Sequence, residues 1–203
     1  MSIRSHQIKK LAASGFTLVE LVMFIVIVGI GVAGILLVYS TTVRGSADPL
    51  VTKQLLSIAE AMLEEVQLMP FTVCDPDDAN AATSTTLAGC ATTPEAIGPE
   101  GTESRYNAAD PFDNVNDYSG FNTATAALPG IRDLSGTPIA ALAGYSASVA
   151  IAAQTLGPGG ATVAGTGAEG PQSLLITVTA TGPQGDSISI SGYRTRYAPT
   201  AVP

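Results

Sequence analysis

An isolated carboxylate near the start of an apolar segment has the most distinctive chemistry in this chain. Glu20 closely follows Gly15, and the 19 residues from Leu21 to Tyr39 carry no charge. Membrane insertion costs a charged side chain near mid-span about 2.5–3.5 kcal/mol, and less near the interface. The helix macrodipole stabilises an acid in the first turn by about 0.3–1 kcal/mol. A deep position for Glu20 therefore requires a cationic partner.

A new chain terminus would supply that positive charge. Cleavage between Gly15 and Phe16 would place an α-amino group on Phe16, about one helical turn from Glu20. A neighbouring copy of the chain could present the same amine, so the pairing would set the register of two adjacent helices. The alternative is that Glu20 is an ordinary acid in the first turn of a helix.

The apolar segment itself predicts a single membrane span. It reaches the length of a spanning helix and exceeds the apolar region of an ordinary secretory signal. Arg4, Lys9 and Lys10 precede Gly15, and the positive-inside tendency holds them on the cytoplasmic side. The residues after the span then face outward. Gly29 and Ala33 are small and would let another helix approach closely, although such spacing is common in apolar helices.

The stretch Gly15-Phe16-Thr17-Leu18-Val19-Glu20-Leu21, between a short basic leader and an apolar helix, resembles the class III signal of type IV pilins and pseudopilins. The resemblance covers about the first 45 residues. It implies that a membrane aspartyl peptidase, the prepilin peptidase, cuts after Gly15 on the cytoplasmic side. It also implies N-methylation of Phe16 and a role for Glu20 in assembly of a helical filament.

Two further features refine the resemblance. Leu37 stands where major pilins usually carry a proline, which favours a minor pilin or a pseudopilin. Residues 58–66 and 69–83 resemble minor pilins of the mannose-sensitive haemagglutinin type. The implied fold is α+β and type IV pilin-like, with a long N-terminal helix that spans the membrane in its first half and packs on a small antiparallel sheet in the head.

An amphipathic helix is predicted over residues 49–69, after an interruption at Ala47-Asp48-Pro49. The aspartate can cap a helix and the proline suits the first helical position, while Pro70 should end it. Apolar side chains recur at steps of three and four and form one stripe, which we expect to pack within its own domain: Val51, Leu55, Ile58, Met62, Val66 and Met69. The other face holds Lys53, Glu60, Glu64 and Glu65.

The chain is predicted to divide into a leader (1–15), a transmembrane and filament-core helix (16–44) and a periplasmic or extracellular head (45–203). Alternating apolar and small polar residues predict three strands in the head, at residues 145–153, 173–180 and 187–197. The glycines and proline of residues 181–186 are typical of a hairpin loop. An antiparallel meander against the helix follows, whereas residues 91–140 are predicted to form loops and short strands.

The two cysteines, Cys74 and Cys90, lie on the outward side of the span. That location is oxidising, so we predict a disulfide between them. It would close a loop of about 17 residues, which the chain-entropy model converts to a stabilisation on the order of 3 kcal/mol. The enclosed residues 75–89 have little with which to fold themselves. A metal site is the rival, but two cysteines without a histidine in the mature chain fall short of a zinc set.

A run of side-chain oxygens between residues 110 and 118 leaves two interpretations open. Calcium takes six to eight oxygen ligands, and Asp113, Asn116 and Asp117 could supply several of them. The spacing is not that of an EF-hand loop, and turn formation alone favours Asn and Asp here. Turn formation is therefore favoured over calcium binding for these three residues. The sequence indicates no other metal and no cofactor.

The sequence does not indicate an enzyme. His6, the single histidine, lies in the leader, which excludes a mature Ser-His-Asp or Cys-His arrangement. Gly165, Gly167 and Gly170 spell G-x-G-x-x-G, but Pro171 and a strand-like run follow, so no helix opens to bind the phosphates of a dinucleotide. The formal net charge is −8, and an acidic body without clustered basic residues argues against nucleic acid as a partner.

The favoured function is that of a minor type IV pilin, a structural subunit that assembles into a pilus, or primes one, through its N-terminal helix. The alternatives are a pseudopilin of a type II secretion system and an uncleaved membrane-anchored binding module. The expected partners are the membrane, other pilin subunits, the prepilin peptidase/N-methyltransferase and the inner-membrane assembly machinery. The expected location is the bacterial inner membrane, crossed once with a cytoplasmic N-terminus, and then the pilus at the cell surface, where cell adhesion is an expected role.

Overall fold

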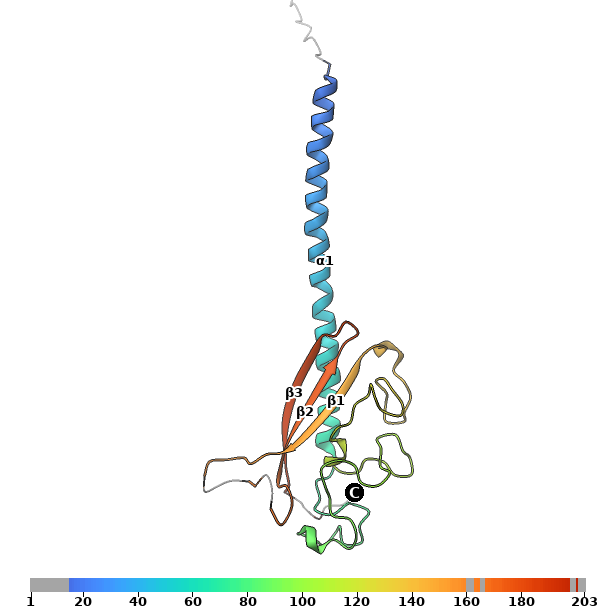
Figure 1. The fold of residues 1–203 in the computed structure, drawn as a ribbon, viewed down its shortest axis with the longest axis vertical. Coiled ribbons are helices and arrows are strands. Elements are labelled where there is room, and N and C mark those ends of the chain that lie inside the picture. The colour runs from blue at the N-terminus through green and yellow to red at the C-terminus, as the bar shows by residue number, and fades with distance from the viewer. Residues whose placement is uncertain (1–14, 160–162, 165–166, 198–199, 201–203) are drawn as a thin grey trace, which may run out of the picture. The chain divides into compact units, whose positions relative to one another are not determined.

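The chain consists of one long helix followed by a small sheet (Figure 1). The computed structural model describes residues 15–159, 163–164, 167–197 and 200, without the side chains of residues 41–48. The elements are α1 (Leu18–Leu68), the short 3₁₀ helices η1 (Leu87–Gly89), η2 (Asn116–Tyr118) and η3 (Ala140–Leu142), and the strands β1 (Ser146–Ala153), β2 (Ser173–Thr181) and β3 (Ser187–Thr195). The predicted α+β class is confirmed.

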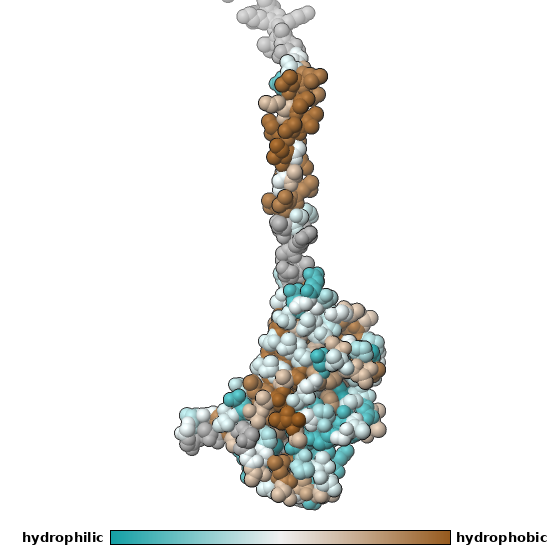
Figure 2. Space-filling view, viewed as in Figure 1, coloured by the Kyte–Doolittle hydropathy of each residue, from teal (hydrophilic) through white to brown (hydrophobic). Residues whose placement is uncertain are grey.

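Two compact units divide the chain, with the boundary between Pro49 and Leu50. In the N-terminal unit, the segment Leu18–Ser40 of α1 is long and apolar enough to cross a membrane. Residues 15–40 are all exposed, and Figure 2 shows hydrophobic side chains along the visible face of this segment. A helix satisfies its own backbone hydrogen bonds, which is what a segment surrounded by lipid requires.

The helix continues through Pro49, where the sequence predicted an interruption. Pro49 lies inside α1, so the prediction of a new helix start at Ala47-Asp48-Pro49 is wrong. A proline in a helix removes one hydrogen bond, because it has no N–H to donate, but its fixed φ is compatible with helical geometry. The predicted end is confirmed, since α1 stops at Leu68, just before Pro70.

The C-terminal unit contains an antiparallel sheet in the order β1-β2-β3. The register runs from Ser146↔Thr181 to Ala153↔Leu174 between β1 and β2, and β2 pairs with β3 in the same antiparallel sense. In the hairpin loop, the Gly182 N–H donates to the Asp186 carbonyl at 2.8 Å. Gly185 has a φ of +90°, which glycine adopts without steric cost. The predicted meander is confirmed.

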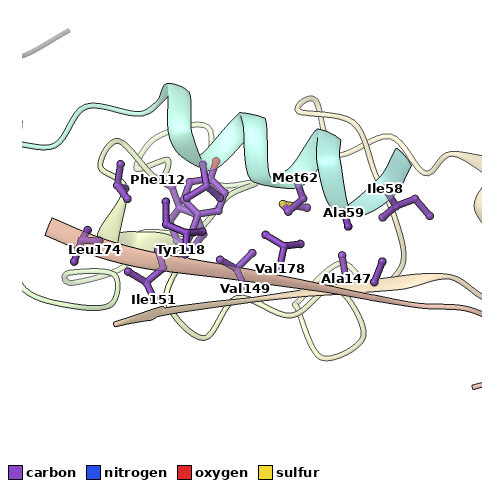
Figure 3. Close-up of a cluster of buried hydrophobic side chains, with 14 of the residues drawn as sticks. Ile58, Ala59, Met62, Phe112, Tyr118, Ala147, Val149, Ile151, Leu174 and Val178 are labelled. Atoms are coloured by element: carbon purple, nitrogen blue, oxygen red, sulfur yellow. The ribbon is translucent and has the colours of Figure 1, made fainter. Parts of the chain in front are cut away.

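The core of this unit lies between the second part of α1 and one face of the sheet (Figure 3). Ile58, Ala59 and Met62 point from the helix toward Ala147, Val149 and Val178 of the strands in that view. Four members of the predicted stripe are buried, and the terminal two pack against the cluster in partly buried positions: Leu55, Ile58, Met62 and Val66, with Val51 and Met69. The stripe therefore packs within its own domain, as expected.

One glutamate on the predicted solvated face of the helix is paired instead. Glu60 and Glu64 are exposed, but Glu65 accepts two hydrogen bonds from Arg105, from Nε to Oε1 at 2.5 Å and from Nη2 to Oε2 at 2.7 Å. The Tyr118 hydroxyl donates to Glu65 Oε1 at 2.8 Å. Arg105 is buried, so this two-pronged pair ties the segment before η2, and η2 itself, to α1.

Leu55→Ala should lower the free energy of unfolding by about 3 kcal/mol, because it opens a cavity in the core between α1 and the sheet. Leu55 is 2 % exposed, whereas Leu68 on the same helix is 76 % exposed. Leu68→Ala is the matched control and should change the free energy by less than about 0.5 kcal/mol. Denaturant titration of the full chain in detergent measures both, and equal losses would contradict the packing of α1 on the sheet.

Glu65→Ala should lower the free energy of unfolding by about 2–4 kcal/mol, because the buried Arg105 guanidinium loses its anionic partner. The neighbouring Glu64→Ala removes a carboxylate of the same kind from an exposed position and should change the free energy by less than about 0.5 kcal/mol. The same denaturant titration tests the pair. A Glu65→Ala protein as stable as the Glu64→Ala protein would show that the Glu65–Arg105 pair does not contribute to the free energy of unfolding.

Candidate functional site

Glu20 lies in the first turn of α1, with its side chain exposed. The residue before the helix, Thr17, accepts a hydrogen bond from the Glu20 N–H on its Oγ1 at 3.3 Å. Its carbonyl accepts from the Leu21 N–H at 3.1 Å. Thr17 is therefore the N-cap of α1, and Thr17-Leu18-Val19-Glu20 has the spacing of a capping box. The Thr-x-x-Glu spacing is a local signal in the sequence that predicts this N-cap.

The residues around the predicted cleavage point lie outside the helix. Gly15 and Phe16 precede α1, and the Phe16 side chain is 83 % exposed. In the part of the chain that the structure describes, the Glu20 carboxylate has no ion pair. The side chains that the structure describes therefore supply no positive charge to Glu20, and the pairing with a Phe16 amine stays a prediction about the cleaved molecule.

Three glycines of the apolar segment have no packing partner within the described residues. A Cβ added to Gly29, Gly31 or Gly34 would meet nothing within 4 Å. A glycine in a helix interior costs about 0.5–1 kcal/mol relative to alanine, and nothing in the described chain compensates for that cost. Small residues that let another helix approach closely are the usual feature of helix interfaces in membranes.

The predicted disulfide between Cys74 and Cys90 is confirmed, with a Cα–Cα distance of 5.5 Å. Cys74 is fully buried, and Val73, Cys74 and Ala81 form a small hydrophobic cluster of their own. The disulfide therefore joins the segment after α1 to the end of a loop, beside an isolated bridge between Cys74 and Pro94.

The enclosed loop is more ordered than its composition suggested, because Asp78 holds several backbone groups together. Its Oδ2 accepts from the N–H groups of Thr92 and Thr93 at 2.7 and 2.9 Å, and its Oδ1 accepts from Ala91 and Asn80 at 2.9 and 2.8 Å. These bonds, with that from Thr93 first, hold the pKa of Asp78 well below its usual range. Asp78 thus fixes the chain on both sides of Cys90.

The structure divides the predicted calcium candidates between two groups of carboxylates. Asp117 lies with Glu95 and Glu100, whereas Asp113 lies with Asp75 and Glu103. Asn116 donates from its side-chain amide to the Ala96 carbonyl. The sequence analysis missed Glu95 and Glu100 because they lie far from Asp117 along the chain, and no local pattern announces contacts of that range.

The loop with the G-x-G-x-x-G spacing lies between β1 and β2. Gly165 is outside the described residues, and β2 begins at Ser173, shortly after Gly170. Gly170 has a φ of +75° and lies in a turn, with its N–H donating to the Gly167 carbonyl at 2.9 Å.

The second part of α1 packed on a three-stranded antiparallel sheet, preceded by an exposed apolar segment, is consistent with a pilin-like architecture. None of the family models, curated proteins or solved structures compared with the chain matches it.

Proposed function

We propose that this chain is a minor type IV pilin that loses its first fifteen residues and assembles into a pilus, or primes one, through its N-terminal helix. The observation that supports this most strongly is the apolar surface of residues 16–40, which is exposed along its whole length. Contiguous apolar surface of this extent marks an interaction with lipid or with other protein surfaces. A filament subunit meets both environments in turn, first the bilayer and then the helices of its neighbours.

Before assembly, the apolar segment anchors the chain in the inner membrane as a single span with a cytoplasmic N-terminus. The prepilin peptidase/N-methyltransferase then removes the leader and methylates the Phe16 amine. Extraction from the membrane by the assembly machinery would expose the segment to water unless neighbouring subunits cover it. The free positions beside Gly29, Gly31 and Gly34 allow that close helix contact.

In this proposal Glu20 neutralises the amine of Phe16 of its own or a neighbouring subunit inside the filament. An ion pair in an apolar environment gains from the low dielectric, but only when both charges are present. A subunit with an unpaired Glu20 is therefore disfavoured in the filament, and the pairing selects the register of adjacent helices. The chain then acts as a structural element, without a catalytic role.

Two alternatives use the same features differently. A pseudopilin of a type II secretion system would carry the same signal and the same helix, but would assemble into a short periplasmic filament. An uncleaved binding module would retain residues 1–15 and use the apolar helix only as an anchor. Leu37, in place of a proline in the span, is compatible with both a minor pilin and a pseudopilin. Co-purification with pilus or secretion components separates these two.

Glu20→Gln should reduce incorporation into filaments by at least about tenfold, which corresponds to about 1.4 kcal/mol, while membrane insertion and cleavage continue. Glutamine removes the charge but keeps the length and the capping-box geometry, so the loss would be electrostatic. The measurement is the ratio of the chain in sheared surface filaments to the chain in membranes, by immunoblot.

Thr17→Ala is the matched control, because it removes the N-cap hydrogen bond seen at Glu20 N and leaves the charge in place. It should cost the helix about 1 kcal/mol and leave most incorporation intact. Wild-type incorporation of Glu20→Gln, or an equal loss in both variants, would contradict the pairing.

A further inference from the structure

Three carboxylates in the C-terminal unit converge at a position with no assigned role. One carboxylate oxygen from each of Glu95, Glu100 and Asp117 lies within 4.8 Å of those of the other two. Glu95 follows the Cys74–Pro94 bridge and is itself held by a hydrogen bond from its N–H to the Val73 carbonyl at 3.0 Å. Asp117 belongs to η2. Two pieces of chain, the loop of residues 95–100 and η2, therefore bring their negative charges together.

Each of the three residues has one buried oxygen that accepts no hydrogen bond from a backbone N–H, amide, guanidinium or hydroxyl group of the described residues, namely Glu95 Oε1, Glu100 Oε2 and Asp117 Oδ1. Glu95 is 4 % exposed and Asp117 is 1 % exposed. Buried polar atoms are almost always satisfied in native proteins, and each exception requires an explanation. Three such atoms on one group of carboxylates indicate a ligand that accepts electron pairs from oxygen.

The second oxygens of Asp117 and Glu100 already accept hydrogen bonds from the protein. Asp117 Oδ2 accepts from the N–H groups of Asp113 and Asn114 at 2.9 and 2.7 Å, and Glu100 Oε1 accepts from the Ala96 N–H at 2.8 Å. These bonds orient the carboxylates of Asp117 and Glu100 and leave one oxygen of each free for a ligand. The adjoining Asn116 also has an unpartnered buried oxygen, Oδ1.

The local charge is strongly negative. A second group, Asp75, Glu103 and Asp113, adjoins the first, and the Glu100 N–H donates to Glu103 Oε2 at 3.0 Å. In the described part of the chain, none of these six carboxylates forms an ion pair with a lysine or arginine. Arg196 interacts electrostatically with Glu95 without a hydrogen bond to it. Six acids therefore share one region with little positive charge from the protein.

The protonation behaviour agrees with an uncompensated site. Burial, followed by the charge of Asp117, raises the pKa of Glu95 to about 10. Burial also raises the pKa of Glu100 to about 7, and it raises the pKa of Asp117. Burial is the largest cause of each shift, and a side-chain hydrogen bond between Glu95 and Asp117 also contributes to the shifts of these two groups. A proton shared between Glu95 and Asp117 is the competing explanation.

We propose that Glu95, Glu100 and Asp117 bind a calcium ion. Oxygens around one calcium lie at 2.3–2.6 Å from it, so two ligands on opposite sides are about 4.8 Å apart, the separation within which these oxygens fall. Zinc sites typically include cysteine or histidine ligands, and the described residues contain no free cysteine and no histidine. Magnesium keeps several of its waters and uses one or two carboxylates, which fits three converging carboxylates poorly.

The ion would connect the segment that follows the disulfide loop to η2, so calcium would order the loops of the head. This inference is independent of the proposed assembly function. Of the three calcium ligands predicted from the sequence, the proposed site keeps Asp117. Glu95 and Glu100 take the places of Asp113 and Asn116.

The test is calcium binding to the full chain in detergent after treatment with EDTA. Titration calorimetry should show saturable heat with CaCl₂, and a calcium concentration 100 times the dissociation constant should raise the unfolding midpoint by about 5 °C or more. MgCl₂ at the same concentration should give a much smaller shift. The absence of both heat and shift with calcium would overturn the site and favour the shared proton, and an equal response to magnesium would overturn the assignment to calcium.

Glu95→Gln should weaken calcium binding at least about tenfold, because it removes a charged ligand. Glu64→Gln, at an exposed carboxylate of α1, should bind as the wild type does. Unchanged affinity of Glu95→Gln would overturn the site. Should that variant not fold, the wild-type chain gives the answer through terbium luminescence excited at tyrosine, since Tyr118 adjoins Asp117. A terbium signal that falls when calcium displaces the terbium supports the site. A terbium signal that is missing, or that calcium does not reduce, overturns it.

Discussion

The apolar surface of residues 16–40 is the constraint on which the rest of the account depends. Burial of a single Val, Leu, Ile or Phe side chain is worth about 1.5–3 kcal/mol, and this segment exposes a long series of them. The described chain provides no cover for it. A segment of this kind is suited to a membrane anchor or a signal sequence, and the functional hypotheses for this chain differ in what covers its apolar surface.

After Pro49, a stripe of apolar side chains of α1 is buried or partly buried instead of exposed. The stripe runs along one side of the helix, and β1, β2 and β3 cover it. The polar side of this part is also used, because Glu65 binds Arg105 and Tyr118. The disulfide and Asp78 then organise the loops that follow. One helix thus serves two units, with a surface pattern that changes at their boundary.

Features encoded by short-range patterns were predictable from the sequence. The alternation of β2, the end of α1 before Pro70 and the Cys74–Cys90 pairing all depend on residue type and local spacing. Pro49 was predicted as a helix start, and the prediction was wrong because one missing hydrogen bond does not end a helix that its neighbours support. The contacts of Glu65 with Arg105 and of Glu95 with Asp117 join distant segments. Tertiary folding alone creates such contacts, so local sequence patterns do not reveal them.

The central claim is that Glu20 has a newly made amine as its partner, which exists only after cleavage at Gly15. Mass spectrometry of the N-terminal peptide, from the chain isolated from membranes and from filaments, tests this directly. The account predicts a peptide that begins with N-methylated Phe16. A mature chain that still begins with Met1 would contradict it, because the apolar helix would then be a permanent anchor and Glu20 would have no terminal amine to pair with.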